Sequence, residues 1–200
     1  MKNKLVCAAA LTAIATVTAF APAYADGHAG HAEHAGEDGH SGTEEEAALV
    51  VEVNLTDADG IGAAVGTVLL EDTEYGLLLT PNLTDLTPGA HGFHIHTNPA
   101  CGPALKEGKM VPGLAAGGHF DPFNTGYHDG PYGDGHLGDL PPLFVAEDGT
   151  ATIPVLAPRL ETDFLNGRSL MVHMHGDNFS DDPAPLGGGG PRLACGVIGE

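Results

Sequence analysis

The sequence predicts an all-β protein, an antiparallel sandwich or barrel of short strands joined by turns and long loops. From residue 49 onward, short β-type stretches recur at similar spacing, with turn-forming residues between them. The first stretch alternates apolar Val51, Val53 and Leu55 with polar neighbours, which is typical of a strand with one buried face. The 30 glycines and 15 prolines disfavour long helices and favour turns.

Residues 1–25 are interpreted as a secretory signal peptide. Two lysines precede an apolar run at 5–20, and the stretch closes on a small-x-small cleavage site that ends at Ala25. The run is short for a helix that spans a bilayer. We therefore expect export to the periplasm or the cell exterior, with no stable membrane insertion once the signal is cleaved.

Residues 26–48 differ in composition from the segments on either side. They hold seven acids, no bases and four histidines among alanines and glycines, so they cannot bury an apolar face, and we expect disorder. The four histidines are His28, His31, His34 and His40. Two interpretations stay open: a solvating acidic tail, or a flexible arm that collects divalent zinc, copper or nickel through imidazole and carboxylate groups.

Residues 49–200 form the predicted folded domain. Its strands are expected at 49–56, 63–70, 75–83, 91–97, 150–156, 169–175 and 194–198. The stretch 98–142 shows little periodicity, and a loop of this length needs something to organise it, for which its histidines and Cys101 are the candidates. Export leaves Cys101 and Cys195 as an even pair in an oxidising compartment, which predicts one disulfide.

The charge of the chain excludes several classes of partner. With 27 acids against 7 lysines and arginines, its formal charge is -20. It lacks the clustered cations that displace counterions from DNA, RNA or an anionic membrane. Nucleic acid is therefore excluded as a partner, and twelve histidines on so acidic a chain need another explanation.

The spacing of the histidines indicates metal binding. His94 and His96 are two apart in a predicted strand, so their side chains leave the same face, about 6–7 Å apart at the Cα atoms. His91 has the opposite parity and is expected to pack or hydrogen-bond instead. Further candidate ligands are His119, His128, His136, Asp139 and His173. Seven candidates exceed the needs of one tetrahedral ion, so the economical interpretation is a two-metal site.

At these residues the sequence resembles the copper/zinc superoxide dismutases in their bacterial secreted form. The motifs in chain order are HGFHIH (91–96), ACGP around Cys101, AAGGHFDP around His119, TGYHDGPYGDGHLGDLPPL (125–143), APRL (157–160), LMVH at His173, GDNFSDDPAPLGGGG (176–190) and RLACGVI (192–198). The resemblance covers about three quarters of the chain. It implies a Greek-key β-sandwich or flattened eight-stranded barrel with long metal-binding and electrostatic loops.

The resemblance also implies a role for each site residue. The copper ligands would be His94, His96, His119 and His173, and the zinc ligands His119, His128, His136 and Asp139. His119 would bridge the two ions and supply protons, and Asp177 would orient one histidine of each set. Arg192 would hold the anion beside copper, and Cys101 and Cys195 match the family's disulfide.

The implied activity is the dismutation of superoxide to dioxygen and hydrogen peroxide, with copper alternately reduced and reoxidised and zinc as its structural partner. The alternative is a secreted copper/zinc-binding or copper-delivery protein on the same fold. Such proteins usually lose copper ligands or the arginine, and this chain keeps them all. Bacterial relatives occur as monomers and dimers, which leaves a homodimer open.

Three positions depart from the family pattern. His175 stands where a glycine is usual, Thr97 replaces an acid, and Tyr127 replaces a lysine. We expect His175 to be an exposed histidine near the site, with an extra ligand or proton carrier as the alternative. Because the chain is acidic and its substrate is an anion, we expect Lys106 and Lys109 to steer superoxide locally.

Overall fold

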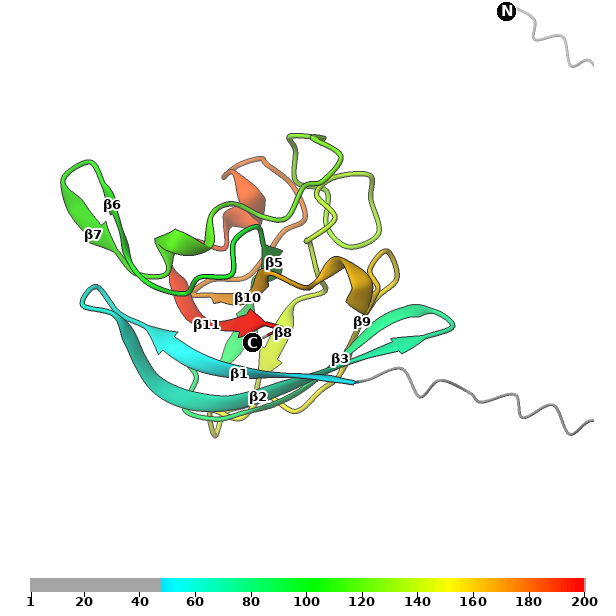
Figure 1. Cartoon of the computed structure of the whole chain (residues 1–200), viewed down its shortest axis with the longest axis horizontal. Helices are drawn as coiled ribbons and strands as arrows, with labels where there is room; N and C mark the ends of the chain where they lie inside the picture. The colour runs from blue at the N-terminus through cyan, green and yellow to red at the C-terminus, as the bar shows by residue number, and fades with distance from the viewer. Residues whose placement is uncertain (1–47, 200) are drawn as a thin grey trace, which may run out of the picture. The chain divides into compact units, whose positions relative to one another are not determined.

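The computed structural model describes residues 48–199, and within them β-strands dominate (Figure 1). The strands are β1 (Leu49–Thr56), β2 (Ile61–Thr73), β3 (Gly76–Leu83), β4 (Gly89–His91), β5 (Phe93–His96), β6 (Ala104–Lys106), β7 (Lys109–Val111), β8 (Leu143–Val145), β9 (Val155–Ala157), β10 (Arg168–His173) and β11 (Arg192–Ile198). Three short 3-10 helices are η1 (Leu114–Ala116), η2 (Thr162–Phe164) and η3 (Leu186–Gly188). The predicted signal peptide and nearly all of the histidine-rich tail lie outside the described residues.

Seven strands form one curled antiparallel sheet in the order β5-β10-β11-β1-β2-β3-β9 (Figure 1). Two further antiparallel pairs, β4 with β8 and β6 with β7, complete the strand structure. The all-β class is therefore confirmed. Among the described residues, no helix is long and apolar enough to cross a membrane.

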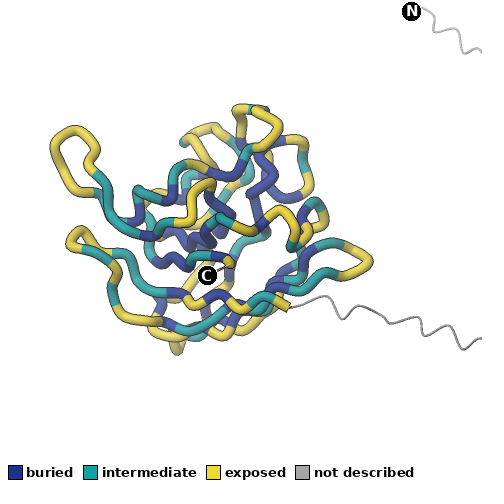
Figure 2. The backbone as a smooth tube through the Cα atoms, viewed as in Figure 1, coloured by how far each residue is buried: buried dark blue, intermediate teal, exposed yellow. Residues whose placement is uncertain are grey.

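Alternation along the strands places one face of the sheet in the core (Figure 2). In β3, every second residue from Leu77 to Leu83 is buried, and in β1 Val51 and Val53 are each 1% exposed. Burying such side chains contributes about 1.5–3 kcal/mol each. Phe93 and Ile95 of β5 lie in the same core, so the strand that carries His94 and His96 is held from its other face.

The predicted strands differ from the observed ones mainly near the site. The stretch 91–97 is divided at Gly92 into β4 and β5, because the Gly92 N–H leaves the ladder and donates to the carbonyl of His175 at 2.7 Å. In 150–156 only the end joins β9, since Pro154 has no N–H to donate. Strands β6, β7 and β8 were not expected.

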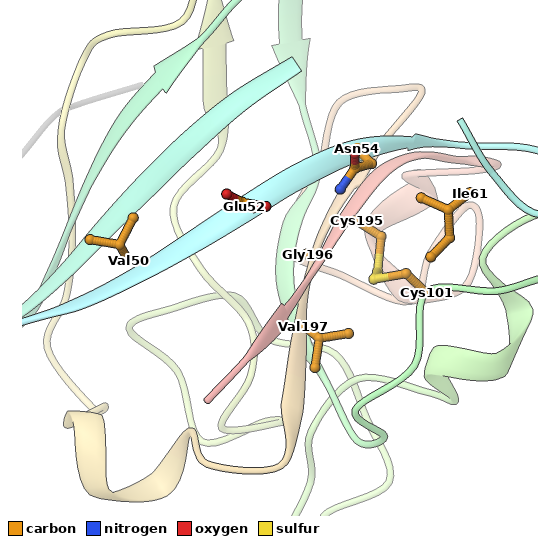
Figure 3. Close-up of a pocket in the computed structure, with 8 residues that line it drawn as sticks. All are labelled: Val50, Glu52, Asn54, Ile61, Cys101, Cys195, Gly196 and Val197. Atoms are coloured by element: carbon orange, nitrogen blue, oxygen red, sulfur yellow. A yellow bond between two sulfur atoms is a disulfide. The ribbon is translucent and has the colours of Figure 1, made fainter. Parts of the chain in front are cut away.

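The long stretch 98–142 is organised at its start by the disulfide Cys101–Cys195, whose Cα atoms are 5.6 Å apart. The predicted pairing is confirmed. From this stretch the β6–β7 hairpin projects away from the curled sheet (Figure 1). Both cysteines also line a pocket of about 220 Å³ on β1 and β11, shown in Figure 3 with Val50, Glu52, Asn54 and Ile61. No histidine lines this pocket.

Candidate metal centre

Strand β5 is the element that collects the predicted ligands. On one side it pairs with β10, placing Met171 opposite His94. On its other side the long loop adds single bridges that place Asp139 opposite His94 and His119 opposite His96. Gly138 makes this approach possible, because a Cβ there would overlap the carbonyl oxygen of Ile95. Four chain segments distant in sequence thus meet along one strand.

Four histidines form the first ligand group. Each offers one nitrogen, and the four nitrogens of His94, His96, His119 and His173 all lie within 4.8 Å of one another. All four residues are buried, and the Nε2 atoms of His96 and His173 are 3.3 Å apart. The rings of His94 and His96 have their centroids 6.4 Å apart, in keeping with two side chains on the same face of a strand.

The second ligand group shares two histidines with the first and is gathered around Asp139. Ligand atoms of His94, His119, His128 and Asp139 lie within 4.8 Å of one another. Asp139 Oδ1 is 2.8 Å from Nδ1 of His119, and its Oδ2 is 2.8 Å from Nδ1 of His128. His136 lies at the edge of this group, with its Nδ1 3.5 Å from Asp139 Oδ1.

Most of these histidines have their second nitrogen occupied by a fixed hydrogen-bond partner. Asp177, whose side chain is 1% exposed, accepts from His94 Nε2 at 2.6 Å and from His128 Nε2 at 2.8 Å, so it joins the two groups. The carbonyl of Gly117 lies 2.9 Å from His96 Nδ1, and that of Gly190 lies 3.1 Å from His173 Nδ1. Such partners fix the tautomer and aim the other nitrogen of each ring at the group.

Five of the atoms aimed into the groups lack hydrogen-bond partners. They are Nδ1 of His94, Nε2 of His119, Nδ1 of His128, Nδ1 of His136 and Oδ2 of Asp139. Nδ1 of His128 is close to Asp139 Oδ2 but is not aligned for a hydrogen bond. Each such buried atom costs about 1–3 kcal/mol. Because nitrogen donors suit copper, and nitrogen with one carboxylate oxygen suits zinc, the residues present fit both metals.

Burial also keeps the first ligand group ready to bind metal. It holds the pKa of His94 and His96 well below the usual value, and it lowers the pKa of His119. For His173, burial lowers the pKa to about 4. Neutral imidazoles keep a lone pair for a metal, so no proton competes for these nitrogens near neutral pH.

His128 differs because it lies between two carboxylates. Burial alone would lower its pKa, but the neighbouring carboxylates of Asp139 and Asp177 outweigh burial and raise it to about 9. Burial would likewise raise the pKa of Asp139, but the close imidazoles of His119, His128 and His136 hold it well below its usual range. Before a metal binds, His128 of the second ligand group is therefore protonated near neutral pH.

Arg192 lies beside the first ligand group. It is opposite His173 in the pairing of β10 with β11. Its Nη1 donates to the carbonyl of Gly113 at 2.8 Å, and its Nη2 donates to the carbonyl of Gly117. The Gly117 carbonyl is also the partner of His96, so one carbonyl oxygen positions both the arginine and a histidine.

The other residues singled out in the sequence lie around the centre. His91 is buried outside both groups, with Nδ1 2.8 Å from the carbonyl of His173 and Nε2 2.7 Å from that of Thr87, as its parity predicted. His175 is exposed and belongs to neither group. Lys106 and Lys109 are exposed and face each other across the β6–β7 hairpin.

Sequence reasoning missed several groups that hold the centre. Main-chain carbonyls, such as those of Gly117 and Gly190, carry no side-chain signal. Asp181 was also missed: its carboxylate accepts the N–H of His128 and that of Leu186, both at 2.8 Å. The role of Arg159 was missed as well, although arginines are so few on this acidic chain that each one is a candidate for a specific role. Arg159 donates to the carbonyls of Gly135 and His136.

Comparison with known proteins agrees with this geometry. Residues 64–198 match the family model described as copper/zinc superoxide dismutase (SODC). The chain is 57% identical over 155 residues to "Superoxide dismutase [Cu-Zn] 2" of Salmonella typhimurium, covering 77% of this chain and 90% of that protein. It is 58% identical over 152 residues to "Superoxide dismutase [Cu-Zn]" of Pasteurella multocida, covering 75% of this chain and 82% of that protein.

Two solved structures are similar along the same stretch. The Cu/Zn superoxide dismutase from Brucella abortus superposes with a TM-score of 0.75 at 52% identity, covering 76% of this chain and all of that one. The solution structure of the monomeric copper, zinc superoxide dismutase from Salmonella enterica gives a TM-score of 0.70 at 57% identity, again with 76% and 100% coverage.

Proposed function

The chain belongs to the copper/zinc superoxide dismutase family, and we propose that its two ligand groups divide one copper and one zinc ion between them. It is a superoxide dismutase, and copper and zinc are its cofactors. Two superoxide anions and two protons give dioxygen and hydrogen peroxide. The observation that carries the assignment of ligands is the set of buried, unpartnered atoms aimed into the two groups.

Copper is assigned to His94, His96, His119 and His173, and zinc to His119, His128, His136 and Asp139. His94 can bind only one ion, because its Nε2 is bonded to Asp177 and only Nδ1 is free. We assign that nitrogen to copper, since His94 is the fourth histidine of the all-histidine group. His136 then supplies the fourth donor near Asp139. When bound, copper supplies reversible one-electron chemistry, whereas zinc keeps one oxidation state and orders its ligands.

His119 has a separate part in the reaction. Its Nδ1 faces Asp139, while its unpartnered Nε2 faces the first ligand group. With a metal ion at each nitrogen the ring would carry no proton, and without an ion at Nε2 it would carry one there. His119 is therefore placed to hold a proton at Nε2 and to donate it to the reduced oxygen species.

Arg192 is proposed to bind the substrate anion. A guanidinium has five N–H donors, and the carbonyls of Gly113 and Gly117 engage only two of its nitrogens. These two bonds fix the plane of the guanidinium beside the first ligand group. The remaining donors can hold superoxide by charge-assisted hydrogen bonds, which are about twice as strong as neutral ones.

Lys106 and Lys109 are proposed to steer superoxide toward the centre. Each of the three arginines in the described part of the chain donates to main-chain carbonyls. The two lysines are exposed on the β6–β7 hairpin, which leads directly into the Gly113–Gly117 segment that holds Arg192. A local positive field can raise the rate of encounter even on an acidic protein.

The organisation of the chain is part of the proposal. Residues 1–25 act as a signal peptide, 26–48 as an acidic tail that either solvates the chain or collects metal through its histidines, and 49–200 as the enzyme domain. The start of β1 at Leu49 and the family match over 64–198 support the last boundary. The enzyme would then work in the periplasm or outside the cell, without nucleic-acid or membrane partners. A homodimer stays a prediction, which sedimentation of the mature protein tests.

The test is metal analysis with superoxide turnover on the mature protein. One copper and one zinc per chain, with turnover lost in His94→Ala and His119→Ala, is the expected result. A protein that holds both metals and does not turn over superoxide would instead point to metal binding or delivery. Removal of residues 26–48 should slow metal loading at low metal concentration, and unchanged loading would leave that segment as a solvating tail.

A further inference from the structure

The arginines of this acidic domain do not pair with carboxylates. In the described residues, every ion pair with an acid is made by a histidine. Arg159 directs its Nη2 to the carbonyl of Gly135 at 2.8 Å and its Nη1 to that of His136 at 3.4 Å. Its guanidinium therefore spans two successive carbonyls of the segment that carries a proposed zinc ligand.

His136 is the proposed zinc ligand that side-chain contacts hold least. Its ring approaches Asp139 only at 3.5 Å, and its Nδ1 lacks a hydrogen-bond partner. His128, by contrast, has its second nitrogen fixed by Asp177. The position of the His136 ring thus depends on the position of its main chain.

The main chain at this point is held from two sides. On one side, the His136 N–H donates to the carbonyl of Tyr127 at 3.2 Å, and Gly135 packs so closely on Asp129 that a Cβ would lie 2.7 Å from the Asp129 nitrogen. On the other side, Arg159 supplies the two hydrogen bonds. Arginine suits this task because its planar fork can engage two acceptors at once, whereas lysine is a point charge.

We propose that Arg159 is a positioning residue of the zinc site, which holds the main chain of Gly135 and His136 so that the His136 ring reaches the metal. The inference rests on the zinc ligands assigned above. Arg159 touches neither metal nor substrate, and its effect passes through the carbonyl of the ligand itself. Loss of its two bonds lets the segment 135–136 move, while the other three zinc ligands keep their own partners.

The experiment uses the mature enzyme with copper bound and cobalt(II) or zinc in the zinc site. The variants are Arg159→Ala, Arg159→Lys and, as a matched control, Arg168→Lys. Arg168 is also an arginine that donates to a carbonyl, that of Thr97 at 2.9 Å; it lies over the Phe120 ring and makes no hydrogen bond to residues 135–136. The readouts are the rate of zinc release to a chelator and the visible bands of cobalt(II), which report the geometry of its ligands.

We expect Arg159→Ala to release zinc about tenfold faster, the lower end of the effect of removing a group that orients a metal ligand. Its cobalt(II) bands should shift or broaden, while the copper bands stay unchanged. Arg159→Lys should release zinc at a rate between those of wild type and Arg159→Ala, and Arg168→Lys should match wild type.

Two results would overturn the inference. One is wild-type zinc release and cobalt(II) bands in both Arg159 variants, and the other is equal acceleration in Arg168→Lys. If Arg159→Ala does not fold without metal, as judged by its unfolding temperature, the rates of zinc release from Arg159→Lys and Arg168→Lys are compared instead. Faster release from Arg159→Lys alone supports the inference, and equal rates overturn it. A wild-type protein that takes up no cobalt(II) would refute the zinc assignment itself, which distinguishes that failure from a failure of Arg159 alone.

Discussion

Replacing Asp177 by asparagine removes a carboxylate that holds His94 of the copper set and His128 of the zinc set. Its oxygens accept from the Nε2 atoms of His94 and His128 at 2.6 and 2.8 Å, and Oδ1 also accepts the N–H of Phe179 at 2.7 Å. An amide has one acceptor oxygen, so its NH₂ group would face one of the two ring N–H groups. At least one histidine then loses the partner that aims its ring.

The size of the effect follows from these contacts. A hydrogen bond to a charged group contributes about 1.5–3 kcal/mol, and losing the partner of a metal ligand costs about 10–100-fold in affinity. We expect zinc affinity to fall by about 10–100-fold in Asp177→Asn, or about 1.4–2.8 kcal/mol. Zinc affinity reports the loss of the His128 contact, because His128 serves zinc alone.

The assay is competition between the mature protein and a zinc chelator. Asp182→Asn is the matched control: it removes the same charge from the same loop, and the Asp182 side chain makes no hydrogen bond to a histidine. A zinc affinity of Asp177→Asn equal to that of the control would refute the reasoning. Unfolding of the metal-free proteins verifies that both variants fold.

Three further predictions concern pH, steering and the glycine run. In metal-free protein, the buried histidines of the first ligand group have lowered pKa values, so stability falls as pH drops below about 6.5, where only the unfolded chain takes up their protons. The raised pKa of His128 acts oppositely: its contribution is full below about 6.5 and is lost as pH rises through about 9; urea unfolding across this range should reveal both losses, and a flat profile would contradict them. Replacing Lys106 and Lys109 by glutamine should lower the rate constant for superoxide at low salt and weaken its salt dependence, measured by pulse radiolysis; a rate and salt dependence equal to those of wild type would remove both lysines from the account. Gly187→Ala should loosen both metals in chelator competition, because φ is +70° there and a Cβ would overlap Asp177 Oδ1. Gly188→Ala, at φ +75°, would place its Cβ in ordinary contact with the Ala184 Cβ at 3.7 Å and should retain both metals; equal retention in the two variants would argue against the overlap.

Much of the fold could be predicted from the sequence, because apolar and polar residues alternate along most of its strands. The pattern of Val51, Val53 and Leu55 predicted β1, and similar patterns predicted β2, β3, β10 and β11. It did not predict the β6–β7 hairpin, whose residues Leu105 and Met110 are exposed and so lack the alternation that burial imposes. The sequence also did not predict that the stretch 91–97 is divided at Gly92, because this division depends on a hydrogen bond to His175, 83 positions further along the chain.

The candidate site divides in a similar way. Every predicted ligand side chain lies at the centre, because imidazoles and carboxylates in a motif carry their chemistry in the residue type. The groups that orient them were harder to find. The carbonyls of Gly117 and Gly190 and the carboxylate of Asp181 act through main-chain geometry that only the fold creates. The longer distance of His136, whose Nδ1 lies 3.5 Å from Asp139 Oδ1, could be found only from the folded structure.

The most direct test of the two-metal account is anomalous X-ray diffraction of the mature enzyme at the copper and zinc edges. We expect copper to be held by His94, His96, His119 and His173, and zinc by His119, His128, His136 and Asp139, with the His119 ring between the two ions. A single ion at the centre, or a His119 ring bound to only one of two ions in the oxidised enzyme, would contradict it.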